Sequence, residues 1–167
     1  MHSLHPTEQE SLGAMLRRPC RLLEERVFGE LAASGFPEIR PAHSVVFQHV
    51  LPEGSRITVL AKEAGMTKQS MAYLVDHLVE HGHLTVSPDP DDGRAKRVHL
   101  TTKAKRFIQA ALAASRAVED ELAKELGAKS MRELQRILAD VETVLRSPAG
   151  GKPPSASAQS IYPNHRP

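Results

Sequence analysis

The sequence predicts a mainly α-helical chain with one small β-hairpin, arranged as a winged helix-turn-helix plus a helical dimerisation region. Three observations support this fold class. Two helical segments meet at a tight Gly-Met-Thr turn, a hairpin pattern follows them directly, and apolar residues keep a heptad spacing near the C-terminus. The length of 167 residues fits one domain with a modest tail.

The N-terminal region, residues 7–50, is expected to form supporting helices. Thr7 with Glu10 fits a capping box. Pro19 either kinks one long helix or starts a second helix at its first turn, and Gly35 closes the segment. A short helix opens at Pro41 and must stop before the next proline. The first helical region is indicated by apolar residues at helical spacing: Leu12, Met15, Leu16, Leu22, Leu23, Val27 and Leu31.

The helix-turn-helix lies within residues 51–101. Thr58 is placed to cap a short helix over 59–64, and Gly65 to end it with a positive φ. Thr67 is placed to cap a second helix over about 68–81, which stops at the following glycine. One face of this second helix is apolar, through Met71, Leu74, Val75 and Leu78.

A hairpin follows the second helix without a break. The strings "HLTVS" and "KRVHL" predict two strands, and "PDPDDG" between them predicts the turn. Arg94 lies just past this turn, where a wing can enter a minor groove, and Asp92 is expected to pair with its guanidinium. The alternative is a solvent-exposed turn arginine, with Asp92 serving only the turn.

The C-terminal region, residues 102–146, is expected to form two dimerisation helices. Thr101 is placed to cap a long helix over 102–126, and a break at "GAKS" leads to a last helix over 131–145. The last helix carries an a/d seam at Met131, Leu134, Leu138, Val141 and Leu145. The stripe either packs on its own domain or is covered by a second chain. A second chain is favoured, because about 45 residues of helix beyond a complete winged helix have apolar faces to bury. The tail, 147–167, is rich in Pro, Gly, Ser and Ala and is predicted to be disordered.

Composition limits the class of protein. The net charge is only +2, but residues 93–106 hold six basic side chains and no acidic one, which suits an anionic partner. No apolar run is long enough to span a membrane, and the N-terminus has no signal pattern. With Cys20 alone there is no intrachain disulfide, so we expect a cytoplasmic protein. No catalytic motif is present, so neither an enzyme nor a cofactor is predicted.

Double-stranded DNA is the predicted partner. The N-terminal residues of the second helix of a helix-turn-helix face base edges in the major groove, while basic side chains of a wing meet the minor groove or phosphates. The predicted contacts on the helix are Thr67, Lys68, Gln69, Ser70, Tyr73 and His77. Those on the wing are Arg94, Lys96 and Arg97, with Asp92 as support.

Residues 55–103 resemble the winged helix of the MarR family of bacterial transcription regulators. The strings that carry the resemblance are "LAKEAGMTKQSMAYLVDHLVEHGHL" and "PDPDDGRAKRVHLT", and the order of flanking helices extends it to about residues 8–146. The resemblance implies a homodimer held by its N- and C-terminal helices. It also implies a palindromic operator, with recognition helices in successive major grooves. Tyr73 departs from the family, which often has a basic residue there.

The resemblance also implies an effector. A small aromatic molecule would bind in a cleft between the dimerisation helices and the DNA-binding lobe, and would release a repressor from DNA by favouring another spacing of the recognition helices. Arg17, His43 and Phe47 are the residues we expect to line this cleft.

Other functions stay open on the sequence. Cys20 is flanked by Arg17, Arg18 and Arg21, and a redox-sensing regulator would use such a thiol; however, no tyrosine of the first helices can partner it. A winged helix can also be a protein-docking module without DNA binding. Such a module would not need a basic recognition helix or a wing arginine, and this chain has both.

Three histidines near the end of the second helix could suggest a metal site. His77, His81 and His83 form an H-x3-H-x-H pattern, whose i, i+4 pair can face one ion. Histidines at a helix C-terminus are also favoured by the helix dipole. No metal is predicted from the sequence.

Overall fold

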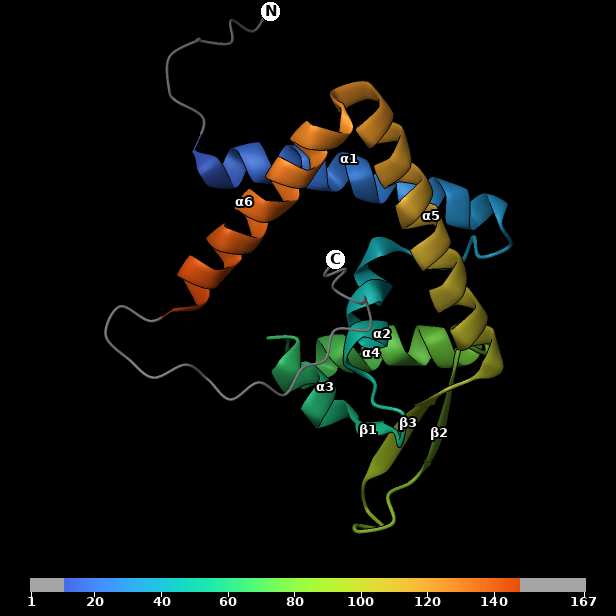
Figure 1. The fold of residues 1–167 in the computed structure, drawn as a ribbon. Helices are drawn as coiled ribbons and strands as arrows, with labels where there is room; N and C mark the ends of the chain where they lie inside the picture. The colour runs from blue at the N-terminus through green and yellow to red at the C-terminus, as the bar shows by residue number, and fades with distance from the viewer. Residues whose placement is uncertain (1–10, 148–167) are drawn as a thin grey trace, which may run out of the picture.

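The chain folds into a helical frame with a small sheet at one end (Figure 1). A computed structural model describes residues 11–147. The capping box at Thr7 and Glu10 and the tail over 148–167 lie outside the described residues. Among the described residues, no helix has the length and apolar character needed to cross a membrane.

Helix α1 (Leu12–Ala33) is one continuous helix with Pro19 inside it, which settles the two alternatives for this region. Ser11 caps it, since its hydroxyl accepts a hydrogen bond from the Ala14 amide at 3.4 Å. The helix ends before Gly35, which takes a φ of +94°. Helix α1 packs against α5 (Thr102–Leu126), and Arg26 forms an ion pair with Glu121 between them.

The helix-turn-helix is built from α3 (Ile57–Glu63) and α4 (Lys68–Glu80). A short 3-10 helix, η1 (Pro41–His43), and α2 (Ser44–His49) precede it. The expected cap at Thr58 is wrong: the helix begins at Ile57, and Arg56 occupies the N-cap position without a side-chain hydrogen bond. The reason is that the chain enters α3 directly from a strand. The turn between the helices uses Gly65 at a φ of +63°, as predicted.

The sheet has three antiparallel strands in the order β1-β3-β2. The hairpin strands β2 (Leu84–Pro88) and β3 (Lys96–Leu100) were predicted, and β2 begins one residue later than expected. Strand β1 (Ser55–Arg56) was not predicted, because a two-residue strand leaves no alternating pattern. It pairs Ser55 with Val98 and Arg56 with Arg97. The wing is therefore anchored to the residues that lead into α3.

The core lies where α2, α4, β2 and the start of α5 meet. The four apolar side chains predicted on α4 are all buried. Phe47 packs on Phe107 with ring centroids 4.7 Å apart, and Phe36 meets Phe107 edge-on at 5.5 Å. His83 lies among these three rings and has no exposed surface. This packing holds the recognition helix against the rest of the domain.

Helices α5 and α6 (Ala128–Arg146) are separated by Gly127 alone, at a φ of +84°. Thr101 caps α5 as predicted, through a hydrogen bond from the Ala104 amide at 3.2 Å. The last helix begins three residues before its predicted start at Met131, because one glycine is enough to turn the chain. Helix α6 has no buried residue within the described chain. In Figure 1 it starts at the end of α5 that lies far from the sheet and diverges from α5 toward the lower left of the view.

Candidate nucleic-acid interface

The N-terminal turn of α4 is an exposed polar surface. The Thr67 hydroxyl accepts a hydrogen bond from the Ser70 amide at 3.1 Å and donates one to the Ser70 hydroxyl at 2.8 Å. Lys68 and Gln69 are exposed beside them, and Tyr73 follows one turn later with 74% of its surface exposed. The opposite face of the helix is buried, so its polar residues must point outward. These five side chains therefore form one continuous face.

His77 does not share this face. It is half-buried, and its Nε2 lies 3.1 Å from the Glu38 carbonyl oxygen. Its ring also stacks on that of His43, with centroids 4.5 Å apart and an angle of 9° between the planes. The structure thus separates His77 from the other predicted DNA contacts on α4, because the ring packs against the loop before η1.

A shallow groove runs along the first turns of α4. It has a volume of about 730 Å³ and is lined by Pro41, Ala42, Val45, Met66, Gln69, Ser70, Tyr73 and Leu74. Most of these side chains are apolar, and the polar ones are those of the exposed face. The groove lies between the recognition helix and the η1–α2 segment.

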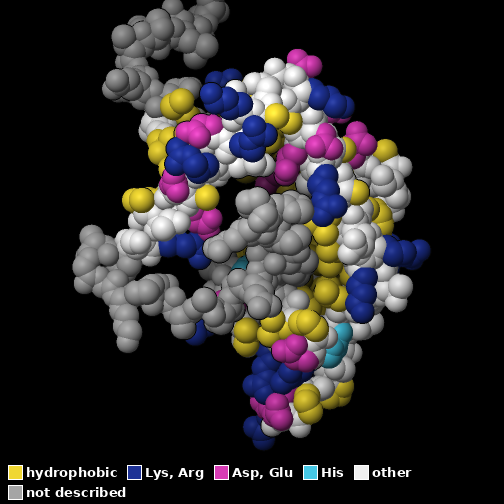
Figure 2. Space-filling view, in the orientation of Figure 1, with side chains coloured by type: hydrophobic (Ala, Val, Ile, Leu, Met, Phe, Trp, Pro, Cys, Tyr) yellow, Lys and Arg dark blue, Asp and Glu magenta, His cyan; other side chains and the backbone are white. Residues whose placement is uncertain are grey.

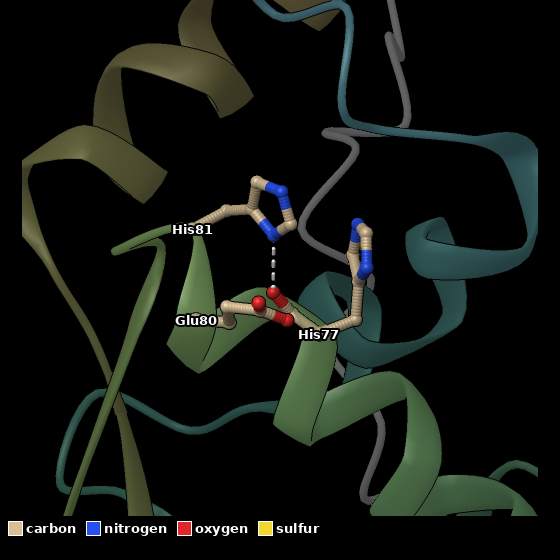
Figure 3. A group of neighbouring side chains, drawn as sticks. All are labelled: His77, Glu80 and His81. Carbon is tan, nitrogen blue, oxygen red and sulfur yellow. Dashed lines mark hydrogen bonds between the residues drawn. The ribbon is translucent and has the colours of Figure 1, made fainter.

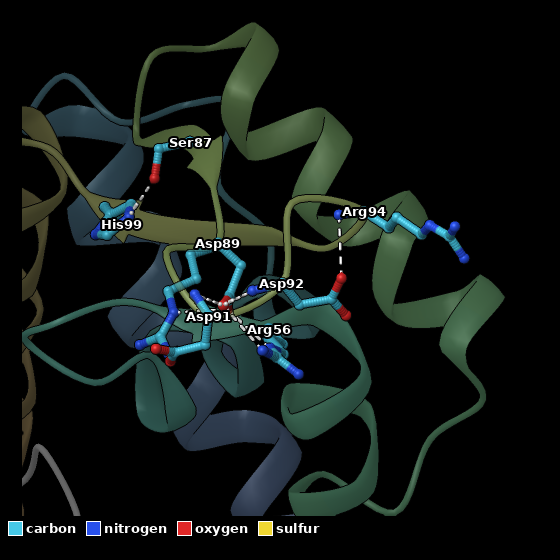
Figure 4. Close-up of polar contacts among 8 residues, drawn as sticks. Arg56, Ser87, Asp89, Asp91, Asp92, Arg94 and His99 are labelled. Atoms are coloured by element: carbon cyan, nitrogen blue, oxygen red, sulfur yellow. Dashed lines mark hydrogen bonds and ion pairs between the residues drawn. The ribbon is translucent and has the colours of Figure 1, made fainter.

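At the wing tip, Arg94 is exposed and its side chain extends away from the hairpin (Figure 4). Its amide donates a hydrogen bond to Asp92 Oδ1 at 3.1 Å. We expected Asp92 to pair with the Arg94 guanidinium; the structure instead gives it a main-chain contact. The Asp92 carbonyl also accepts from the Ala95 amide at 2.8 Å. Asp92 therefore shapes the turn, which in turn presents Arg94.

Asp89 holds the wing in place, and the sequence analysis missed it. Its carboxylate is buried and accepts from Arg56 Nε and Nη2 at 2.7 and 2.8 Å. It also accepts from Arg97 Nε at 2.7 Å, and from the amides of Asp91 and Asp92 at 2.9 and 3.1 Å. Hydrogen bonds from Arg56 above all, then from Arg97, hold the pKa of Asp89 well below its usual range. This carboxylate fastens the turn to β1 and β3 at once.

The structure places the two remaining basic residues of the wing differently. Lys96 is exposed, which suits the predicted contact with phosphate. Arg97 is half-buried, and its guanidinium is shared between Asp89 and Asp91, the latter at 3.2 Å. Arg97 was expected to lie against the DNA backbone, but its side chain is engaged within the wing. Figure 2 shows Lys and Arg side chains, with some acidic ones, gathered at this end of the molecule.

The three residues expected to line an effector cleft do not share a cavity wall. Arg17 is exposed on α1. His43 and Phe47 are each only 4% exposed, and both are packed against neighbouring rings. His43 Nδ1 accepts a hydrogen bond from the Arg40 amide at 3.0 Å, and burial lowers the pKa of His43 to about 4. His43 and Phe47 are thus core residues in this conformation.

His83 is separate from the other two histidines of the H-x3-H-x-H pattern. Its Nε2 lies 2.8 Å from Glu38 Oε1, and burial lowers its pKa. Lys103 also donates to Glu38 Oε1, at 2.6 Å. Burial alone would raise the pKa of Glu38. The hydrogen bonds from Lys103 and His83 have a larger, opposite effect, so the pKa is lowered to about 2. Through its bonds to His83 and Lys103, Glu38 joins the loop between α1 and η1, called the Glu38 loop, to the start of α5.

Cys20 is exposed on α1. Of the arginines beside it in sequence, Arg21 lies 3.4 Å from Glu25 in an ion pair one helical turn away. The structure shows no contact that would mark this thiol as a sensor among the described residues.

The arrangement of helices and wing is that of a winged helix-turn-helix protein. The MarR family model matches residues 41–95, which include η1, α2, the helix-turn-helix and the wing turn. Similar solved structures include wild-type MarR from E. coli, with 22% identity, 80% of this chain and 98% of that chain covered, and a TM-score of 0.63. The repressor CouR bound to a 23-mer DNA duplex has 23% identity, covers 84% and 99%, and has a TM-score of 0.64.

A second structure of CouR, from Rhodococcus jostii RHA1, was determined with p-coumaroyl-CoA. It has 22% identity, covers 82% of this chain and 95% of that chain, and has a TM-score of 0.59. At these identities the likeness establishes the fold. The segment 41–95, which holds the helix-turn-helix and the wing turn, is thus similar to the MarR family, and the chain has the winged-helix fold of these neighbours.

Proposed function

We propose that the chain is a dimeric, sequence-specific repressor that binds a palindromic operator and is released by a small aromatic effector. The observation that carries the proposal is the exposed face of α4, with Thr67, Lys68, Gln69 and Ser70, combined with an outward Arg94 on a braced wing. Gln and Lys on such a helix can bond base edges in the major groove. A DNA partner agrees with the cytoplasmic location expected from the sequence.

Helix α6 supports a homodimer. Its apolar stripe is exposed in the single chain, through Leu134, Ile137, Leu138, Val144 and Leu145. Helix α1 exposes a second stripe, through Leu12, Met15, Leu16, Leu22 and Leu23. Exposed apolar stripes of this kind are typical of protein–protein interfaces. A second copy of the chain would present the same stripes across a two-fold axis and bury them. In this proposal residues 7–50 and 102–146 serve dimerisation and support, and 51–101 bind DNA.

The proposed effector is a small aromatic molecule. A CouR structure contains p-coumaroyl-CoA, which supports an aromatic class of ligand for a regulator with this fold. With His43 and Phe47 packed in the core, binding at the expected cleft would need these rings to move. Such a ligand acts by preferring one spacing of the two recognition helices over the other.

The function is tested by selecting bound DNA from genomic fragments with the purified full chain. We expect enrichment of a palindrome, and a mobility shift on it that random competitor DNA does not abolish. The triple variant Lys68→Ala, Gln69→Ala, Ser70→Ala should no longer enrich the palindrome. Val59→Ala, an exposed position on α3, is the control and should enrich it as the wild type does. No enriched sequence with the wild-type chain would favour a protein-docking module instead.

A further inference from the structure

The last turn of α4 brings together three side chains that can bind a metal ion. His77, Glu80 and His81 each offer one ligand atom, and these atoms lie within 4.8 Å of one another (Figure 3). Positions i, i+3 and i+4 share one face of a helix, so the backbone itself sets this grouping. Glu80 is exposed and both histidines are half-buried, so the cluster is open to solvent on one side.

The hydrogen bonds of the two rings leave one nitrogen of each for a ligand. His77 Nε2 faces the Glu38 carbonyl at 3.1 Å, and His81 Nδ1 faces the His77 carbonyl at 2.8 Å. A carbonyl oxygen only accepts, so each of these nitrogens carries the hydrogen. The lone pairs are then on His77 Nδ1 and His81 Nε2. Histidines that bind metals commonly donate from the other ring nitrogen to a carbonyl or carboxylate. In Figure 3 the bonded Nδ1 of His81 is the ring nitrogen on the Glu80 side, so the His81 ring must turn for Nε2 to bind an ion together with Glu80.

The surroundings of the cluster also restrict the orientation of its rings. His43 lies flat against His77 at 4.5 Å and limits how its ring can turn. The neighbouring cation Lys103 is directed to Glu38 Oε1 at 2.6 Å and to the His81 carbonyl at 2.9 Å. Its charge is therefore countered by a carboxylate outside the cluster. Glu80 supplies a negative charge that a divalent ion would neutralise.

We propose that His77, Glu80 and His81 bind one divalent transition-metal ion, with Zn²⁺ the best match to the donor set. Two imidazoles and one carboxylate are ligands that Zn²⁺ accepts in four-coordinate sites, leaving one position for water. Mg²⁺ and Ca²⁺ prefer sites made of oxygen ligands. The ion would join the end of the recognition helix to the Glu38 loop through His77. This inference does not depend on the DNA-binding function.

Binding is tested on the full chain after chelator treatment and dialysis. Co²⁺ replaces Zn²⁺ in such sites and is visible by its absorption, so titration with Co²⁺ followed by displacement with Zn²⁺ gives both stoichiometry and affinity. We expect saturation at about one ion per chain. Glu80→Gln and His81→Gln should each weaken binding by roughly tenfold or more. His49→Gln, at the end of α2 and outside the cluster, should bind as the wild type does.

Circular dichroism separates loss of ligands from loss of fold. Glu80 is exposed, so its substitution leaves the core intact and provides the variant least affected by folding. The proposal is overturned if the wild-type chain binds no Co²⁺ below millimolar concentration. It is equally overturned if Glu80→Gln and His81→Gln bind as tightly as the wild type, because the ion would then be held elsewhere, for instance by terminal histidines such as His2.

Discussion

The exposed stripe on α6 gives a quantitative prediction for dimerisation. Leu134 and Leu138 lie on this stripe, and 44% and 40% of their surfaces remain exposed in the single chain. If a second copy covers them, replacing both by Ala removes apolar surface from the dimer interface and leaves the interior of each protomer largely unchanged. The double variant Leu134→Ala, Leu138→Ala should therefore shift the equilibrium toward monomers.

The size of the shift follows from the exposed fractions. Leu→Ala removes Cγ and both Cδ atoms, and each buried carbon contributes about 0.8 kcal/mol. Scaled by the exposed fractions, the two substitutions cost roughly 2 kcal/mol per protomer and roughly 4 kcal/mol per symmetric dimer. Since about 1.4 kcal/mol is a factor of ten, the dimer Kd should rise by roughly a thousandfold.

Sedimentation equilibrium over a range of protein concentrations measures this Kd. The matched control is Leu51→Ala, which removes the same atoms from a leucine with 49% exposure that lies outside α1 and α6. The control should dimerise like the wild type. A wild-type chain that stays monomeric at micromolar concentration, or a double variant with an unchanged Kd, would refute the assignment of α6 to the interface.

Two predictions concern the wing. Arg94→Ala should weaken operator binding by about 1–3 kcal/mol, and Lys96→Ala should instead lower the slope of log affinity against log salt by about one, both measured by fluorescence anisotropy at several salt concentrations. If the two variants changed affinity and salt dependence in the same way, Arg94 would not have a groove contact distinct from a phosphate contact of Lys96. Asp89→Asn should lower the melting temperature at pH 7, because Arg56 and Arg97 lose their shared counter-charge, and exposed Asp91→Asn is the control. The folded pKa of Asp89 is depressed, so the wild-type advantage is full above about pH 4 and is lost as the pH falls through the folded value. An advantage that persists in strong acid would argue against the ion pairs as its source.

The helices and the hairpin could be predicted from the sequence because their signals are local. The cap at Thr67, the buried positions from Met71 to Leu78 and the hairpin turn each depend on residues close together in the chain. The start of α3 was misjudged for the opposite reason. Thr58 is a good cap by local rules, but pairing of Ser55 with Val98 puts the chain into a strand until Arg56. That pairing spans residues far apart in sequence.

The sequence predicted the side chains of the candidate site that are exposed on α4. It did not predict the side chains whose position depends on hydrogen-bond partners far away in the chain. The exposed face of α4 follows from the helical period, since the buried positions determine the outward ones. The roles of Asp89, Arg97 and His77 depend on Arg56 and Glu38, which lie 33 or more positions away from Asp89 and His77. Asp92 was the nearer and more obvious support for Arg94 in the sequence. The structure gives the buried ion pairs to Asp89 because its side chain points toward β1.

The shared carboxylate of Asp89 has a consequence for how an operator can be read. Arg56 immediately precedes α3, so its bonds to Asp89 fasten the wing to the helix-turn-helix. If α4 and the wing each meet a DNA groove as proposed, the distance between those two grooves is fixed within a protomer. A half-site whose grooves are spaced differently must therefore deform on binding, because the wing and α4 have little freedom to change their separation. In the proposed dimer, tolerance for different half-site separations would lie between the two protomers, at α1, α6 and the single-residue turn at Gly127.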